Sequence, residues 1–233
     1  MPKVIKKRVT KKTQKEGDLG EAVVDIRKKL QEQQSTLVYA LFIFGLIIII
    51  VGGFVVYNRT NANKAVDLES EGYRILTGIS SMPYASPADR YKSALEKFNA
   101  SYAAKKNPTV LLYIANCYYE LGNFDEAIKV LKDLINQYTD PKITSLAYYK
   151  MAMTYIKRGD MNNALNTFGI ITSIKDFPLQ DMALFESAKT LEAIGRIQEA
   201  KNKYKELINK FPKSPLIGEA QIRLATPQEK AKS

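Results

Sequence analysis

The chain has 233 residues, with 35 Lys and Arg against 24 Asp and Glu, one cysteine and no histidine. One cysteine excludes an internal disulfide, and the lack of histidine excludes His-based metal sites and Ser-His-Asp triads. Much of the formal net charge of +11 lies near the N-terminus, where the first 36 residues carry ten Lys or Arg and five Asp or Glu. Elsewhere Lys and Glu alternate along expected helix faces, which indicates a solvated surface more than a nucleic-acid track.

Residues 1–36 are predicted to form a basic arm. Residues 1–17 are rich in Lys and lack apolar periodicity, which predicts disorder in solution. A stripe at helical spacing then predicts a short amphipathic helix, formed by Leu19, Val23, Ile26 and Leu30. The stripe could form a parallel dimer seam or lie on lipid headgroups, and the lysines of the arm could contact anionic lipid or rRNA.

Residues 37–57 form an apolar run without a charged side chain. A run of about 20 apolar residues matches the thickness of a bilayer, so a transmembrane helix is expected. A cleaved signal peptide is the alternative, but 36 residues precede the run and no small-x-small cleavage site follows it. Gly45 and Gly52 share one face and could admit a second helix, although a plain lipid-facing anchor needs no such partner.

The flanks of this run predict its orientation. The arm before it is strongly basic, whereas Arg59, Lys64 and Arg74 after it are balanced by three acidic residues. The positive-inside rule therefore places the N-terminus in the cytoplasm. The rest of the chain is expected outside the cytoplasm, which is the periplasm in a bacterium with two membranes.

Residues 58–106 are expected to hold a linker helix and a degenerate first repeat. Helix-forming composition extends from Asn61 to about Ile79, and a Ser- and Pro-containing segment interrupts it. A second helix is predicted from about Pro87 to Ala104. Its apolar side carries Tyr91, Ala94, Phe98 and Tyr102.

A six-residue signature, Gly-x-apolar-polar-polar-Ala, begins at Gly122, Gly159 and Gly195 and recurs every 36 to 37 residues. Each Gly is expected to end one helix in the left-handed conformation, and the next residue to cap the following helix. Asn123, with Glu126 in a capping box, and Asp160 suit that cap, whereas Arg196 does not.

Side-chain size alternates in the second helix of each pair. Ala127, Ala164 and Ala200 are expected at close helix crossings, each followed four residues later by a large side chain. The large residues are Leu131, Phe168 and Tyr204. Before later helices, Asp140 and Ser214 stand ahead of prolines as further candidate caps.

These residues resemble the tetratricopeptide repeat, a helix-turn-helix unit of 34 residues. The matching small, aromatic and Gly positions are Ala115, Tyr118 and Gly122; Ala152, Tyr155 and Gly159; and Ala188 and Gly195, with Leu191 at the third aromatic position as a departure. The resemblance implies an all-α repeat solenoid with three repeats over residues 107–213. A capping helix is expected at 214–225 and a disordered tail at 226–233.

One membrane span, a basic arm and an extracytoplasmic repeat domain are together similar to YfgM-like bacterial inner-membrane proteins. That resemblance implies association with secretory clients, the translocon or periplasmic chaperones. The expected function is a membrane-anchored scaffold that assists secretion or folding of envelope proteins. The alternative is a structural assembly factor that oligomerises or holds one fixed partner.

Partner contacts are expected on the concave face of the array, which the resemblance assigns to particular positions of the first helix of each repeat. These positions hold Leu112, Asn116, Tyr119, Glu120, Tyr149, Met153, Ile156, Lys157, Phe185, Lys189 and Glu192. The aromatic and thioether side chains suit an apolar or extended peptide. The alternative is that the chain's own first or last helix fills this groove.

Other site types find little support in the sequence. Some tetratricopeptide domains hold the C-terminal carboxylate of a partner with a clamp of Lys, Asn and Arg side chains. Here only Asn116 matches the clamp, because Leu112, Met182 and Glu186 occupy the positions of the basic residues. No P-loop or Gly-rich nucleotide fingerprint is present, so neither a cofactor nor an enzymatic activity is expected. Cys117 is expected to be a buried, unreactive thiol within a helix.

Overall fold

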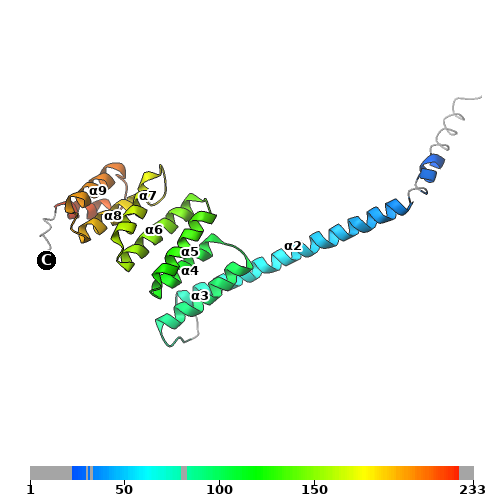
Figure 1. Cartoon of the computed structure of the whole chain (residues 1–233), viewed down its shortest axis with the longest axis horizontal. Coiled ribbons are helices and arrows are strands. Elements are labelled where there is room, and N and C mark those ends of the chain that lie inside the picture. The colour runs from blue at the N-terminus through cyan, green and yellow to red at the C-terminus, as the bar shows by residue number, and fades with distance from the viewer. Residues whose placement is uncertain (1–22, 30, 32–33, 80–82, 226–233) are drawn as a thin grey trace, which may run out of the picture. The chain divides into compact units, whose positions relative to one another are not determined.

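The computed structural model describes residues 23–29, 31, 34–79 and 83–225 (Figure 1). Its elements are α2 (Gln34–Leu76), α3 (Pro87–Ala104), α4 (Pro108–Glu120), α5 (Phe124–Gln137), α6 (Pro141–Arg158), α7 (Met161–Ser173), α8 (Gln180–Ala193), α9 (Ile197–Lys210) and α10 (Ile217–Ala225). Residues 23–29 are also helical. The predicted all-α class is therefore confirmed for the described chain, which divides into two units at Arg59 and Thr60.

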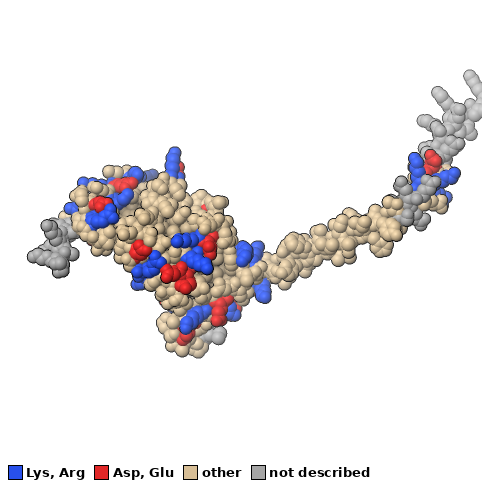
Figure 2. Space-filling model, viewed as in Figure 1, with Lys and Arg blue, Asp and Glu red and all other residues tan. Residues whose placement is uncertain are grey.

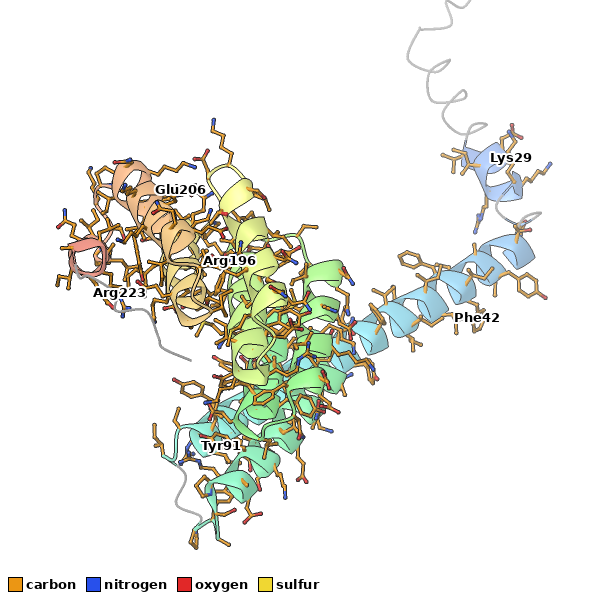
Figure 3. All side chains as sticks on the ribbon, turned by 60° about the vertical axis from the view of Figure 1, so that its left-hand side comes forward. Lys29, Phe42, Tyr91, Arg196, Glu206 and Arg223 are labelled. Carbon is orange, nitrogen blue, oxygen red and sulfur yellow. The ribbon has the colours of Figure 1, made fainter. Side chains whose placement is uncertain are left out.

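The first unit contains the apolar part of α2. From Val38 onward α2 has the length and composition of a membrane span, with a mean hydropathy of 2.8 in its most apolar window. Its side chains are exposed, Phe42 among them at 74% (Figure 3), and no charged residue interrupts the apolar stretch (Figure 2). Val23 and Ile26 of the amphipathic stripe are exposed as well. Leu19 and Leu30, like the segments 1–17 and 226–233, lie outside the described residues.

The second unit begins with the last turns of α2, which pack against α3. Ser101 of α3 is buried and donates a hydrogen bond to the carbonyl oxygen of Ala65 at 2.8 Å. The ring of Phe98 lies directly on the backbone of Gly72, where a Cβ atom would approach Cε1 to 2.9 Å. Lys97 and Glu71 form a salt bridge at 2.9 Å at the edge of this contact. The end of α2 and α3 thus make a helix pair ahead of the three Gly-containing ones.

Three antiparallel helix pairs follow, α4 with α5, α6 with α7, and α8 with α9. Gly122, Gly159 and Gly195 separate the helices of each pair, with φ values of 77°, 89° and 77°. The amide after each Gly donates to a carbonyl in the last turn of the preceding helix, as Asp160 does to Tyr155 at 2.8 Å. These are left-handed helix termini that glycine adopts without steric cost, so the prediction for the three glycines is confirmed.

The predicted caps were partly right. The side chains of Asp140 and Asp160 accept hydrogen bonds from the amides of Lys142 and Asn163. The Asn123 side chain makes no cap hydrogen bond, so the capping box was wrong. The Glu126 half of the box is lost because the Asn123 amide already donates to the carbonyl of Tyr118 at 2.9 Å.

The core runs through the helix pairs as predicted from side-chain size. Ala127, Ala164 and Ala200 are fully buried, and so are the large residues four positions later, Leu131, Phe168 and Tyr204. Each Ala lets two helices approach closely, and the following large side chain fills the space beside the crossing. At the end of the array, Ala220 of α10 is buried against α8 and α9.

Candidate protein-interaction site

The residues predicted for the concave face lie on α4, α6 and α8, the first helices of the three pairs. Seven of them are half-buried: Asn116, Tyr119, Tyr149, Met153, Ile156, Lys189 and Glu192. Glu120 and Lys157 are exposed, whereas Leu112 and Phe185 are buried. The row of side chains is therefore accessible in its middle and closed at two positions.

A pocket of about 230 Å³ opens between α4 and α6 in the accessible part of the row. It is lined by Ala115, Asn116, Tyr119, Leu131, Leu146, Tyr149, Lys150, Met153 and Thr154. Four of these residues, Asn116, Tyr119, Tyr149 and Met153, were predicted from the sequence. The structure thus brings together predicted positions from two neighbouring repeats.

Apolar groups form most of the pocket wall, and their packing fixes the two tyrosines. Tyr119 meets Phe124 edge-on at 5.9 Å between ring centroids, and Tyr149 packs against the buried Phe168 at 6.0 Å. Burial, with the charge of Glu186, raises the pKa of Tyr149 to about 12. Its hydroxyl is therefore neutral at physiological pH and can donate a hydrogen bond at the rim.

Lys150 supplies the one cationic group of the pocket lining. Burial lowers the pKa of its ammonium group, and the charge of Glu120 opposes this change. Within the described chain, no salt bridge or hydrogen bond involves the Lys150 ammonium. Its backbone carbonyl accepts a hydrogen bond from the buried Thr154 hydroxyl at 2.7 Å. This bond satisfies the buried Thr154 hydroxyl and does not involve the Lys150 amine.

Sequence reasoning missed Lys150, because the repeat positions assigned to the concave face do not include it. The same holds for Leu146 and Thr154. The available signal was the helical spacing, since Leu146, Lys150 and Met153 follow one another at intervals of four and three along α6. That spacing places them on one face of the helix, next to the predicted Tyr149.

Two predicted contact residues need correction. Leu112 is 5% exposed and belongs to the core of the first helix pairs, so it cannot be offered to a partner. Phe185 is 4% exposed, because its ring packs edge-on against Tyr204 and under the cations of Lys189 and Arg223. Its predicted place on an accessible concave surface is therefore wrong.

The C-terminal helix is part of the reason that Phe185 is covered. The guanidinium carbon of Arg223 in α10 lies 5.9 Å from the centroid of the Phe185 ring, and the guanidinium group forms salt bridges with Glu192 and Glu219 at 2.9 Å each. The expectation that the chain's own last helix fills the groove is thus met at this position. It is not met between α4 and α6, where the pocket stays open.

The polar groups of the pocket are few and of mixed type. Its polar groups are one amine, one amide, two phenols and a hydroxyl already bound to the backbone. In the part of the chain that the structure describes, no cluster of His, Cys, Asp or Glu could hold a metal ion. An apolar recess with a few polar groups at its edge is the ordinary composition of a recognition site.

Antiparallel helix pairs, each divided by a left-handed Gly and stacked in sequence order, define an α-helical repeat protein of the kind that binds other proteins. Two family models described as tetratricopeptide repeat match residues 88–147 and residues 146–173 with 182–214. The chain therefore belongs to the tetratricopeptide repeat family.

One solved structure supports this fold, and two others are more distantly similar. Tetratricopeptide-like repeats of a putative kinesin light chain from Podospora anserina align with a TM-score of 0.52 and 15% identity, over 70% of this chain and 85% of theirs. MamA aligns with a TM-score of 0.44 and 16% identity, over 61% of this chain and 92% of that chain. The TPR2AB domain of yeast Sti1 in a complex with pHSP90 aligns with a TM-score of 0.41 and 18% identity, over 69% of this chain and 71% of that chain. No curated protein matches the sequence.

Proposed function

We propose that this protein is a membrane-anchored scaffold that binds other proteins through the α4–α6 pocket on the extracytoplasmic face. The pocket of Tyr119, Tyr149 and Met153 is the observation that carries the proposal. Aromatic and thioether groups concentrate binding energy when a partner excludes water from them. The exposed Glu120 and Lys157 beside the pocket, with Ile156, Lys189 and Glu192 further along the row, would form its rim.

Membrane anchoring is supported by the composition of α2 and of its flanks. The apolar window of α2 is long enough to cross a bilayer, and none of it is buried in the protein. The excess of Lys and Arg before it favours a cytoplasmic N-terminus. The repeat array would then lie outside the cytoplasm, where proteins emerge from the translocon in an extended state.

The proposed task is assistance to secretion or folding of envelope proteins near the translocon. An extended client exposes apolar side chains that a folded protein buries, and an apolar pocket on a membrane-tethered array would meet them early. The support is the combination of a tether, a small apolar pocket and a rim with both charge signs. A scaffold that oligomerises or holds a single fixed partner is the competing function.

Site-specific photo-crosslinking in living cells separates these functions. A photoreactive residue at Tyr149 or Tyr119 is expected to capture many unfolded secretory proteins, whereas the same group at the exposed Lys132 of α5 should capture few. A single stoichiometric partner or self-crosslinks would instead favour the assembly factor. Equal yields at Tyr149 and Lys132 would contradict the pocket as the binding site.

A further inference from the structure

The α4–α6 pocket is too small for a cofactor. Its volume of about 230 Å³ lies below the roughly 300–1,000 Å³ of common small-molecule sites. One side chain of a peptide is the ligand that such a recess can enclose. The walls of Leu146, Met153 and the two tyrosine rings suit an apolar or aromatic side chain.

The charge of the pocket lining is unbalanced, because the lining includes the cation of Lys150 and no carboxylate. Lys150 is half-buried in the lining, and no carboxylate of the described chain lies within salt-bridge distance of it. A partly desolvated charge that lacks a partner is unfavourable, so an incoming anion gains more here than at the open surface.

The neighbouring carboxylates do not take this place. Glu120 is exposed and acts on Lys150 through its field, without a contact. Glu186, which influences Tyr149, is engaged by Lys189 of its own helix at 3.1 Å. Both leave the Lys150 ammonium to a ligand.

We propose that the pocket selects an extended peptide in which an apolar side chain lies next to an Asp or Glu side chain. The ammonium group of Lys150 binds the carboxylate of that acidic residue. The apolar side chain enters the recess between Tyr119 and Tyr149, and the acidic side chain lies along the rim. This inference rests on the proposed function, because it names the chemistry of the partner at the same site. One ammonium suits a single side-chain carboxylate, whereas capture of a chain terminus draws on several donors at once.

Affinity selection tests the proposal with the full-length protein in detergent micelles. The probe is a library of randomised dodecapeptides, acetylated and C-terminally amidated so that side chains are the only source of carboxylates. We expect Asp or Glu within two residues of a Phe, Tyr or Leu to be enriched roughly fivefold over the input library. Free-acid peptides run in parallel should show no further gain.

Matched variants assign the preference to Lys150. Lys150→Met keeps the length of the side chain and removes the charge, so selected peptides should retain their apolar residue and lose their acidic neighbour. Lys142→Met removes an exposed charge from the same helix, away from the pocket and its rim, and should leave the enrichment unchanged. Circular dichroism confirms that both variants are helical.

Three results would overturn the inference. They are no acidic enrichment with the wild type, an enrichment that survives Lys150→Met, and a gain confined to free-acid peptides, which would identify a terminal carboxylate as the ligand. If Tyr149 still crosslinks to secretory proteins in cells, the proposed function stands while this selectivity falls. If neither the crosslinking nor the peptide selection detects a partner, both the proposed function and the proposed selectivity are wrong.

Discussion

At the scale of single residues, Gly72 and Phe98 make the tightest contact between α2 and α3. A Cβ atom on Gly72 would lie 2.9 Å from the Phe98 ring, which is fully buried and stacked on Tyr113 at 5.0 Å. Ala is favoured over Gly inside a helix by about 1 kcal/mol, but overpacking a core costs about 1–3 kcal/mol. We therefore expect Gly72→Ala to lower the free energy of unfolding by about 1 kcal/mol, measured by urea denaturation.

Gly169 is the matched control for this substitution. It lies inside α7 and is exposed, and a Cβ atom added to it would meet no atom within 4 Å beyond its own helix. Gly169→Ala should therefore raise the free energy of unfolding by about 0.5–1 kcal/mol through helix propensity alone. If Gly72→Ala stabilised the protein as much as Gly169→Ala, the Phe98 ring would have to be free to move.

Cys117 makes stability depend on pH in the alkaline range. The thiol is fully buried, and burial raises its pKa to about 12 from about 9. Between these values the unfolded chain releases the proton and the folded chain keeps it, so stability falls as pH rises above 9. One group can contribute a slope of at most about 1.4 kcal/mol per pH unit.

Urea unfolding of the wild type and of Cys117→Ala at several pH values between 8 and 11 would measure this slope. The wild type should lose stability more steeply above pH 9, and the difference between the two proteins should stay constant below it. Parallel curves would contradict a buried, protonated thiol. Tyr102 and Tyr149, whose pKa values burial also raises, titrate in both proteins and cancel in the comparison.

At the scale of helices, Asp140 and Asn123 each directly precede a helix, but only Asp140 caps its helix through its side chain. Asp140 accepts a hydrogen bond from the Lys142 amide at 2.8 Å, whereas the Asn123 side chain makes no cap hydrogen bond. Asp140→Ala should therefore lower the free energy of unfolding by about 1 kcal/mol, the usual cost of a lost cap. Asn123→Ala should change it by less than about 0.3 kcal/mol, and an equal loss in both variants would contradict the assignment of the caps.

Local geometry could be predicted from the sequence because short-range chemistry sets it. Gly122, Gly159 and Gly195 end helices since glycine alone adopts positive φ without cost, and this depends only on the neighbouring turns. The small Ala127 and the large Leu131 likewise imply a helix crossing wherever they occur together. The Glu126 half of the Asn123 box failed because the Asn123 amide has two possible acceptors, and sequence spacing does not reveal which acceptor it bonds.

The site was less predictable because it depends on contacts between helices distant in sequence. Tyr119 and Tyr149, which the repeat positions singled out, both line the α4–α6 pocket. Phe185 was placed on the same face, but Arg223 and Tyr204 from other helices cover it. Helical spacing within α6 places Lys150 beside Tyr149 and Met153, but the space that these residues line also depends on α4.

At the scale of the whole molecule, each helix pair contacts mainly its neighbours along the chain. In such an array, a perturbation at one end should stay local. Ala220 of α10 is fully buried against the last pair, so Ala220→Asp would place a charge in that contact. We expect faster amide hydrogen exchange in α8 and α9 and unchanged exchange in α4 and α5.

Gln221→Asp adds the same charge to the exposed face of α10 and should leave exchange in α8 and α9 unaltered. Hydrogen exchange followed by mass spectrometry resolves these helices separately. Uniformly faster exchange in Ala220→Asp would show that the array unfolds as one cooperative body.

The proposed topology is tested with cysteines placed on either side of the apolar run. Cys117 is buried, so the wild-type protein is a suitable background for labelling. Asn63→Cys and Asp25→Cys both replace exposed residues, the first after the run and the second before it. In bacterial spheroplasts, a membrane-impermeant maleimide should label Asn63→Cys at once and Asp25→Cys only after lysis, because the basic arm stays in the cytoplasm. The reverse pattern would invert the orientation, and labelling of both before lysis would contradict a membrane span.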